Sequence, residues 1–377
     1  MSKSEGPTRP PGSGRPSGGG PPYSTDPQPP TVGPVTPEVV QPPIQLRVYG
    51  EDVVLPLDPT VDMFRLGSGL DVHLHLPRRY VSRRHVTLRR IGSQLEITNL
   101  SSNGTRVAGE SIIERILGAA GKFEVGETTL VILDEPMVRL RAVLARALGF
   151  AAHLDVDRAL LLAMTHINAP LILTGPRGAE SERIAAAIHR ATARRAQPFV
   201  VVDVTGTKDA MLAAIAAAVE GTVFIDVRPL KNKRASRALL AALGEATFRA
   251  RVIIGATTND QARVALDRES AKLDEIRTPP VAARGREIPA LLDAYLAEAG
   301  SPHRITELAP DRIDALRRFD WPENLDEVRR AAVRLAVYLD AERNISAAAR
   351  QLGVTPQSLG EWLERIGAIA RRGRGGA

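Results

Sequence analysis

The chain has 377 residues, enough for two or three domains, and 44% of them are hydrophobic although only 4% are aromatic. It has no cysteine, which excludes disulfides, thiolate nucleophiles and thiolate metal ligands. Lys and Arg outnumber Asp and Glu by 50 to 43, and this net charge of +7 permits polyanionic partners without requiring one. No stretch approaches the ~18 apolar residues of a membrane span and none resembles a signal peptide, so we expect a cytoplasmic protein without membrane contacts.

Residues 1–43 are dominated by Pro, Gly, Ser and Thr and hold almost no large apolar side chain. Such a segment cannot bury enough surface to offset the entropy lost on ordering, so we predict a disordered arm. Its threonines could be kinase targets, although a plain tether is the simpler interpretation.

Residues 44–134 consist of short segments with partial alternation of apolar and polar residues, separated by Gly, Asn, Asp and Ser. We expect strands in IQLRVYG, DVVLPL, VHLHL, HVTLRRI, QLEITNL, KFEVG and TTLVILD. Regularly spaced short strands are typical of an all-β sandwich or barrel.

The pattern changes from residue 138. Helical segments (VRLRAVLARALGF, DRALLLAMTHI, SERIAAAIHRATARRA, DAMLAAIAAAVE) alternate with apolar strand-like runs (LILTG, PFVVVDV, TVFIDV, RVIIGATT). This alternation over 138–287 predicts an α/β domain with a mainly parallel sheet. Residues 288–341 and 342–370 show only helical patterns, and a short basic tail over 371–377 follows them.

Three motifs in the β-rich segment occur in a characteristic order: Gly67 with Asp71 and Val72, then Ser82-x-x-His85 in VSRRH, then Asn103-Gly104-Thr105 in LSSNGT. Together they resemble the forkhead-associated (FHA) domain over about ninety residues. The resemblance implies an all-β sandwich whose loops at one end bind a phosphothreonine peptide of a partner protein.

The resemblance also assigns roles to residues of these loops. The hydroxyl groups of Ser82 and Ser102 would donate hydrogen bonds to the phosphate, and Arg83 or Arg84 would add positive charge. Asn103 would hold the peptide backbone, and His85 would brace the loop. A dianion with three acceptor oxygens is well matched to such convergent donors.

One position departs from the FHA pattern. The family usually has an arginine directly after the first glycine, where this chain has Ser68. Phosphate binding then depends on compensation by Arg65, Arg83 or Arg84. The alternative interpretation is an FHA fold kept as a phosphate-independent docking module.

The stretch GPRGAESERIAAAIH follows an apolar strand and opens a helix, as a phosphate-binding loop does. With GTVFIDV, RVIIGATTND, PPVAARGREIP and WPENLDEVRR it resembles the AAA+ domain of bacterial enhancer-binding proteins, the sigma-54 activators. The resemblance covers residues 138–341 and implies an α/β domain with a helical lid over 288–341.

The residues that would carry ATP chemistry are mostly replaced. Gly175 and Gly178 are present, but the lysine position is Ser181 and the glycine before it is Glu180. Asp226 could still hold Mg²⁺, whereas the water-activating glutamate position is Val227. The sensor arginine position is Asp326, and nothing between His189 and Asp226 resembles the GAFTGA loop that contacts sigma-54.

Phosphoryl transfer depends on positioned positive charge. We therefore expect a catalytically inactive scaffold with no catalytic residue, no cofactor and no metal; whether ATP still binds without hydrolysis stays open.

The segment NISAAARQLGVTPQSLGEWLERIG resembles the Fis-type helix-turn-helix of many enhancer-binding proteins. Gly353 suits the turn, Thr355 suits an N-cap and Pro356 suits the first helical position. The second helix would enter the major groove with Thr355, Gln357 and Ser358 at base edges, while Arg350, Arg365 and the tail arginines neutralise phosphates.

Glu361 and Glu364 are unfavourable beside DNA, and the alternative interpretation is a helical hairpin used for packing or dimerisation. Because helix-turn-helix domains generally bind DNA as dimers, we expect a homo-oligomer.

The leading interpretation is a phosphothreonine-dependent transcriptional regulator or signalling protein that binds a phosphoprotein and DNA around an inactive AAA+ scaffold. One alternative is an active sigma-54-dependent activator ATPase. Another is a phosphoprotein-binding adaptor that does not bind DNA.

Overall fold

The computed structural model describes residues 41–165, 169–230, 233–245, 249–266 and 273–370. The predicted basic tail and all but the last three residues of the predicted arm lie outside these ranges.

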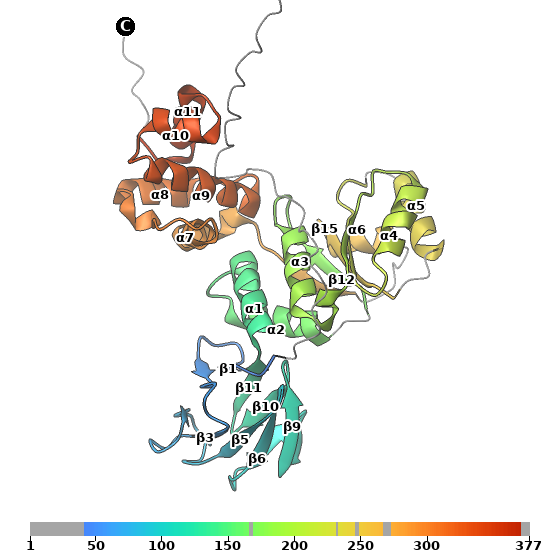
Figure 1. The fold of residues 1–377 in the computed structure, drawn as a ribbon, viewed down its shortest axis with the longest axis vertical. Coiled ribbons are helices and arrows are strands. Elements are labelled where there is room, and N and C mark those ends of the chain that lie inside the picture. The colour runs from blue at the N-terminus through green and yellow to red at the C-terminus, as the bar shows by residue number, and fades with distance from the viewer. Residues whose placement is uncertain (1–40, 166–168, 231–232, 246–248, 267–272, 371–377) are drawn as a thin grey trace, which may run out of the picture.

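The first domain is a sandwich of two sheets, as the strand pattern predicted (Figure 1). One sheet has the strand order β2-β1-β11-β10-β7-β8 and the other has the order β4-β3-β5-β6-β9. The strands are β1 (Gln45–Val48), β2 (Val54–Pro56), β3 (Met63–Gly67), β4 (Leu74–His75), β5 (Val86–Ile91), β6 (Gln94–Asn99), β7 (Thr105–Val107), β8 (Glu110–Ile112), β9 (Glu114–Gly118), β10 (Lys122–Val125) and β11 (Thr128–Leu133).

Alternation along the strands builds the core of this sandwich. Phe64 and Leu66 of β3 are buried while Met63 and Arg65 are exposed, because successive side chains of a strand point to opposite faces. Strands β3, β7, β8 and β9 were not among the expected segments; β7 and β8 each have three residues, too few to display a period of two.

The second domain is an α/β unit whose sheet is parallel throughout, with the strand order β13-β14-β15-β12-β16. Leu171 and Leu173 of β12 belong to the apolar core shared with α1, α2 and α3, whereas Ile172 belongs to the core shared with α4, α5 and α6. Helices therefore cover both faces of the sheet, which explains why its strands are apolar on both sides. The elements are α1 (Glu135–Leu148), α2 (His153–Thr165), β12 (Leu171–Thr174), α3 (Ser181–Ala191), β13 (Phe199–Val202), α4 (Lys208–Ala217), β14 (Thr222–Asp226), α5 (Lys233–Glu245), β15 (Arg251–Ala256), α6 (Asn259–Ala265) and β16 (Asp274–Arg277).

A single helix was expected over SERIAAAIHRATARRA, but the structure has an α-helix followed by a separate 3₁₀ turn. Thr192 adopts an extended conformation (φ −100°, ψ 169°), and its hydroxyl donates to the His189 carbonyl at 2.9 Å, so α3 ends at Ala191. A 3₁₀ turn over Ala193–Ala196 follows. A threonine hydroxyl that bonds its own backbone competes with helix continuation.

The remaining residues form a helical lid and a terminal helix pair: α7 (Ile288–Glu298), α8 (Pro310–Arg318), α9 (Asn324–Asp340), α10 (Ile345–Leu352) and α11 (Pro356–Ile366). Leu359, Leu363 and Ile366 of α11 share one apolar core with α7, α8 and α9. The terminal pair is thus packed onto the lid, at the end of the molecule opposite the sandwich (Figure 1).

A buried charge cluster joins the sandwich to the α/β domain. The Asp157 carboxylate of α2 accepts a hydrogen bond from the Gly50 amide at 2.8 Å and one from Arg141 Nε at 2.7 Å. Arg47 Nε of β1 lies 3.5 Å from the same carboxylate, and the Arg47 and Asp157 side chains are each only 4% exposed. The buried Asp157 carboxylate therefore makes contacts with residues of both domains.

We expect Asp157→Ala to loosen this junction, because it leaves Arg141 without its carboxylate and buried Arg47 with only the exposed Asp52 as an ionic partner, and breaking a buried ion pair typically costs about 3–5 kcal/mol. Hydrogen exchange of the full chain should accelerate in β1, α1 and α2 but not in α9 to α11. The matched variant is Asp155→Ala, whose carboxylate is 64% exposed and lies 3.8 Å from Arg158. Equal exchange in the two variants would contradict a structural role for the cluster.

Candidate functional site

Two loops of the sandwich meet through a pair of serine hydroxyls. The Ser82 Oγ lies 2.6 Å from the Ser101 Oγ, and the Asn103 amide donates to Ser101 Oγ at 3.1 Å. The Asn103 side-chain amide donates to the Tyr80 carbonyl at 3.0 Å. Ser82 and Asn103, both predicted site residues, are therefore brought together.

His85 is the buried brace between these loops, as predicted. Its Nδ1 accepts a hydrogen bond from the Ser82 amide at 3.0 Å, which places the ring proton on Nε2, 3.0 Å from the Gly104 carbonyl oxygen that accepts it. Burial lowers the pKa of the His85 imidazole. The neutral ring thus links the Ser82 loop to the Asn103 loop.

The predicted cations differ in their surroundings. Arg84 is ion-paired with Asp71, while the Arg83 side chain is exposed. Ser68, at the family's arginine position, donates its hydroxyl to the Val81 carbonyl at 2.7 Å and so holds the loop instead of facing a ligand. Gly67 is required there, because a Cβ would lie 2.2 Å from the Arg83 carbonyl oxygen.

Ser102 is exposed at the tip of its loop, and its neighbour Ser101 makes the contact with Ser82. Sequence reasoning missed Ser101. The Ser101 backbone amide donates to Asn99 Oδ1 at 3.2 Å, and Thr105 Oγ1 donates to the same oxygen at 2.8 Å. Asn99 therefore fixes the loop that aims Ser101 inward.

The phosphate-loop segment connects β12 to α3 at the carboxyl end of the sheet, where α/β proteins bind ligands. Here the start of α9 packs directly on the loop. Gly178 (φ +79°) accepts a hydrogen bond from the Asp326 amide at 3.1 Å, and a Cβ on Gly178 would lie 2.0 Å from the Glu323 carbonyl oxygen. Asn324 adds a bond from its side-chain amide to the Arg177 carbonyl at 2.8 Å.

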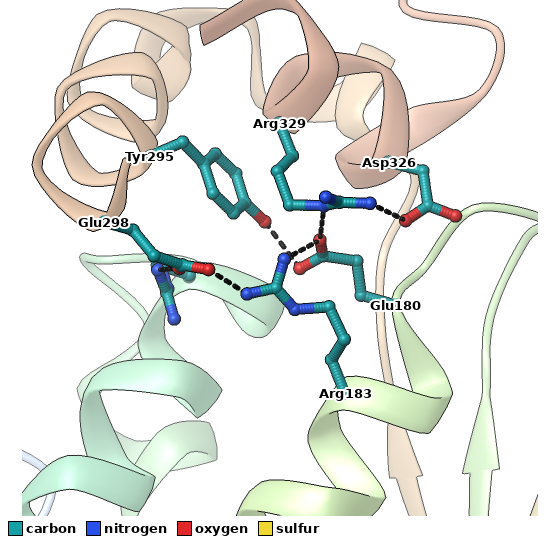
Figure 2. Close-up of polar contacts among 7 residues, drawn as sticks. Glu180, Arg183, Tyr295, Glu298, Asp326 and Arg329 are labelled. Atoms are coloured by element: carbon teal, nitrogen blue, oxygen red, sulfur yellow. Dashed lines mark hydrogen bonds and ion pairs between the residues drawn. The ribbon is translucent and has the colours of Figure 1, made fainter. Parts of the chain in front are cut away.

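Glu180 is the centre of a polar network between the loop and the lid (Figure 2). Its carboxylate accepts from Tyr295 Oη of α7 at 2.7 Å and from Arg329 Nε of α9 at 3.0 Å. Arg183 NH1 of α3 lies 3.2 Å from the same carboxylate and Arg183 also pairs with Glu298. The Glu180 side chain is 9% exposed, and burial raises the pKa of its carboxyl while Arg183, Tyr295 and Arg329 oppose that effect.

The backbone of Glu180 keeps a conformation that favours glycine, with φ 55° and ψ 33°. A left-handed conformation costs a residue with a side chain about 1–2 kcal/mol. The three hydrogen-bond donors around the carboxylate offset this cost.

The residues at the remaining positions of the nucleotide-site motifs are also buried or bound to other residues of the chain. Ser181 is buried at the start of α3, Gly175 is packed against Ala179 and Thr278, and Val227 is fully buried. Arg228, which sequence reasoning missed, binds both oxygens of Asp226 at 2.8 and 2.7 Å. Arg228 NH1 also donates to the Pro176 carbonyl of the loop at 3.3 Å.

The terminal helix pair has the predicted local geometry. Gly353 has φ +66°, Thr355 Oγ1 accepts from the Ser358 amide at 3.1 Å, and Pro356 begins α11. Gln357 and Ser358 are exposed at the start of α11, and Arg350 and Arg365 are exposed as well. Glu361 accepts a hydrogen bond from Gln357 Nε2 at 2.9 Å, on the same exposed face.

Within the described residues no helix has both the length and the apolar character needed to cross a membrane. Over the same residues no group of three or more His, Asp and Glu side chains is arranged to hold a metal ion.

Family models match two segments of the chain. An FHA domain model matches residues 64–125, and a sigma-54 interaction domain model matches residues 151–224. The second match ends two residues before Asp226. These matches confirm the two resemblances predicted for the sandwich and for the α/β domain; the helix-turn-helix stays a prediction.

Curated relatives are transcriptional regulators. The C4-dicarboxylate transport transcriptional regulatory protein DctD of Pseudomonas aeruginosa is 27% identical over 236 residues, covering 52% of this chain and 50% of the relative. The nitrogen assimilation regulatory protein NtrX of Azorhizobium caulinodans is 25% identical over 223 residues, covering 49% of each. The chain thus spans about half the length of these relatives.

Two solved structures resemble parts of the chain. NtrX from Brucella abortus, in complex with ATP, is 20% identical and covers 62% of this chain and 68% of its own, with a TM-score of 0.39. An FHA domain from a study of phosphothreonine-dependent interactions is 26% identical and covers 24% of this chain and 96% of its own, with a TM-score of 0.23. The chain combines an FHA domain with a domain of the sigma-54 interaction type.

Proposed function

We propose that this protein is a regulator of transcription controlled by threonine phosphorylation of a partner. Its FHA domain binds the phosphothreonine segment, its α/β domain and lid form a scaffold that does not hydrolyse ATP, and α10 and α11 bind DNA. The observation that carries the proposal is the hydrogen-bonded cluster of Ser82, Ser101, Asn103 and His85, which joins the two loops that the FHA resemblance assigns to phosphate recognition.

The serine pair supports a donor role for Ser82. Ser101 Oγ accepts a hydrogen bond from the Asn103 amide and can donate its own proton to Ser82 Oγ. With that direction of the bond, the Ser82 proton is available to an incoming phosphate. Exposed Arg83 adds a cation beside it, and a charge-assisted hydrogen bond is about twice as strong as a neutral one.

The loop-to-lid contacts support the scaffold role. Bound ATP would need positive charge around its phosphates, and the chain places the Glu180 carboxylate there. Asp226, the remaining Mg²⁺ ligand, is held on both oxygens by Arg228. Phosphoryl transfer requires positive charge at the phosphates and a free carboxylate for Mg²⁺. Here a carboxylate, Glu180, lies at the phosphate position, and a cation, Arg228, binds the magnesium ligand.

The regulator relatives support an output at DNA, and α11 offers the geometry for it. Thr355, Gln357 and Ser358 lie at the start of an exposed helix, the part that a helix-turn-helix places against base edges. If this helix makes no contact with DNA, the protein is instead a phosphoprotein-binding adaptor.

The full chain should bind a phosphothreonine peptide library in preference to the unphosphorylated library. Ser82→Ala, Arg83→Gln and Asn103→Ala should each weaken this binding about tenfold or more, since a hydrogen bond to a charged group contributes about 1.5–3 kcal/mol. Fluorescence polarisation measures the affinities. Arg115→Gln, an exposed arginine on β9, is the matched control and should change nothing. Equal affinity for both libraries would instead indicate a phosphate-independent docking module.

Calorimetric titration of the full chain with ATP and Mg²⁺ should give no binding heat. The reason is that Ser181 replaces the lysine that would bind the phosphates, and the Glu180 carboxylate beside it repels them. The double variant Glu180→Gly with Ser181→Lys rebuilds the glycine–lysine pair, and binding gained only by this variant assigns the loss to these two positions. ATP hydrolysis by the wild type that disappears in Asp226→Ala would establish the active ATPase instead.

Glu180→Ala should lower the free energy of unfolding by about 1–3 kcal/mol, because the Tyr295 hydroxyl and two guanidinium groups lose their acceptor. Glu180→Gly should cost about 1 kcal/mol less than the alanine variant, since glycine relieves the left-handed backbone. Urea unfolding followed by fluorescence reports this region, because Trp321 is buried in the lid. The control Glu323→Ala removes a carboxylate that is 64% exposed and should change stability little. No difference between Glu180→Ala and this control would show that the network does not stabilise the lid.

A further inference from the structure

The terminal helices and the lid form one packed unit. A Cβ on Gly367 (φ +83°), at the end of α11, would lie 2.5 Å from the Ala315 Cβ of α8. Trp362 of α11 lies under the Arg334 guanidinium of α9, with 4.7 Å from Arg334 Cζ to the ring centroid. The connection between α9 and α10 is fixed as well, since Arg343 NH2 donates to the Glu307 carbonyl at 2.6 Å. A partner bound by α11 therefore meets the neighbouring surface of α9 in a constant geometry.

Arginines from two helices gather on this neighbouring surface. Arg334 is half-buried against Trp362, and Arg365 is exposed on the face of α11 that also carries Gln357 and Glu361. Partial burial lowers the pKa of the Arg334 guanidinium, and the positive charges of Arg330 and Arg365 add to that effect. The charges of Arg330 and Arg365 therefore both act on Arg334, whose position is fixed by its contact with the Trp362 ring.

Carboxylates balance only part of this charge. Arg330 pairs with Glu323, but within the described ranges no ion pair of 4.0 Å or less joins Arg334 or Arg365 to a carboxylate. Glu361, an acidic residue on the exposed face of α11, accepts a hydrogen bond from Gln357. The Trp362 ring orients Arg334, because a guanidinium stacked on an aromatic face is held in one direction.

We propose that α9 of the lid is part of the DNA-contact surface: Arg334, with Arg330 and Arg365, binds the phosphate backbone beside the groove that α11 enters. This inference rests on the proposed DNA binding by α11 and extends it to a helix outside the helix-turn-helix. A row of phosphates supplies the negative charge that Arg334 and Arg365 lack in the free protein.

The test measures binding of the full chain to a short fluorescein-labelled DNA duplex of mixed sequence over a range of salt concentrations. Each phosphate contact contributes about 0.9 to the slope of log K against log salt concentration. Arg334→Gln should reduce the magnitude of the slope by about 0.9, and Arg334→Gln with Arg365→Gln by about twice that amount. Arg334→Lys keeps the charge and should restore the slope. Arg139→Gln, an exposed arginine of α1 that pairs with Glu135, is the control for net charge.

The outcomes separate this inference from the proposed function. If the wild type does not bind the duplex at low salt, DNA binding by the chain is refuted. If it binds with a slope that Arg334→Gln and the double variant leave unchanged, while Thr355→Ala and Gln357→Ala weaken binding, α11 binds DNA and the lid does not. If Arg334→Lys lowers the slope as much as Arg334→Gln, the effect comes from packing against Trp362 and not from charge.

Discussion

The Glu180 carboxylate is the interaction on which the arrangement of the α/β domain and lid depends. It is a buried anion at the phosphate loop, and its donors come from three helices: Arg183 of α3, Tyr295 of α7 and Arg329 of α9. A side chain of the loop itself thus joins the loop to the lid, beside the hydrogen bonds that the Gly178 and Arg177 carbonyls accept from α9.

This fixed lid gives the neighbouring parts a fixed geometry. The sandwich is joined to α2 through Asp157, and the terminal helices share the apolar core of the lid. The FHA domain and α11 consequently lie at opposite ends of a structure that is packed at each junction (Figure 1). If the proposed function holds, this geometry presents a phosphoprotein at one end at a set distance and orientation from DNA at the other.

The sequence predicted the order of the domains and most of the larger elements, because their signals are local. Alternating apolar residues mark strands such as β5 and β6, and the Thr355–Pro356 pair marks the start of α11. The short strands β7 and β8 were missed, and so was the break at Thr192, where one hydroxyl decides between continuing and ending a helix.

The sites were predictable in type but not in every contact. Motif spacing located the loops that hold Ser82 and Asn103, yet it selected Ser102 where the structure aims Ser101 at Ser82. Which of two adjacent serines points inward depends on Asn99, six positions before Thr105, and no spacing rule contains that information. Arg228 was missed for a similar reason. The motif residue Asp226 is present in the sequence, but its spacing does not show that Arg228 binds its carboxylate.

The left-handed backbone of Glu180 and its buried side chain depend on each other. A glutamate has no intrinsic reason to adopt φ 55°, whereas a glycine adopts such a conformation without steric cost. The conformation is stabilised here because the carboxylate binds Tyr295, Arg183 and Arg329. A lysine at position 181 would lie beside Glu180 and compete with Arg183 and Arg329 for the same anion. The unusual backbone and the buried carboxylate are therefore two parts of one contact between the loop and the lid.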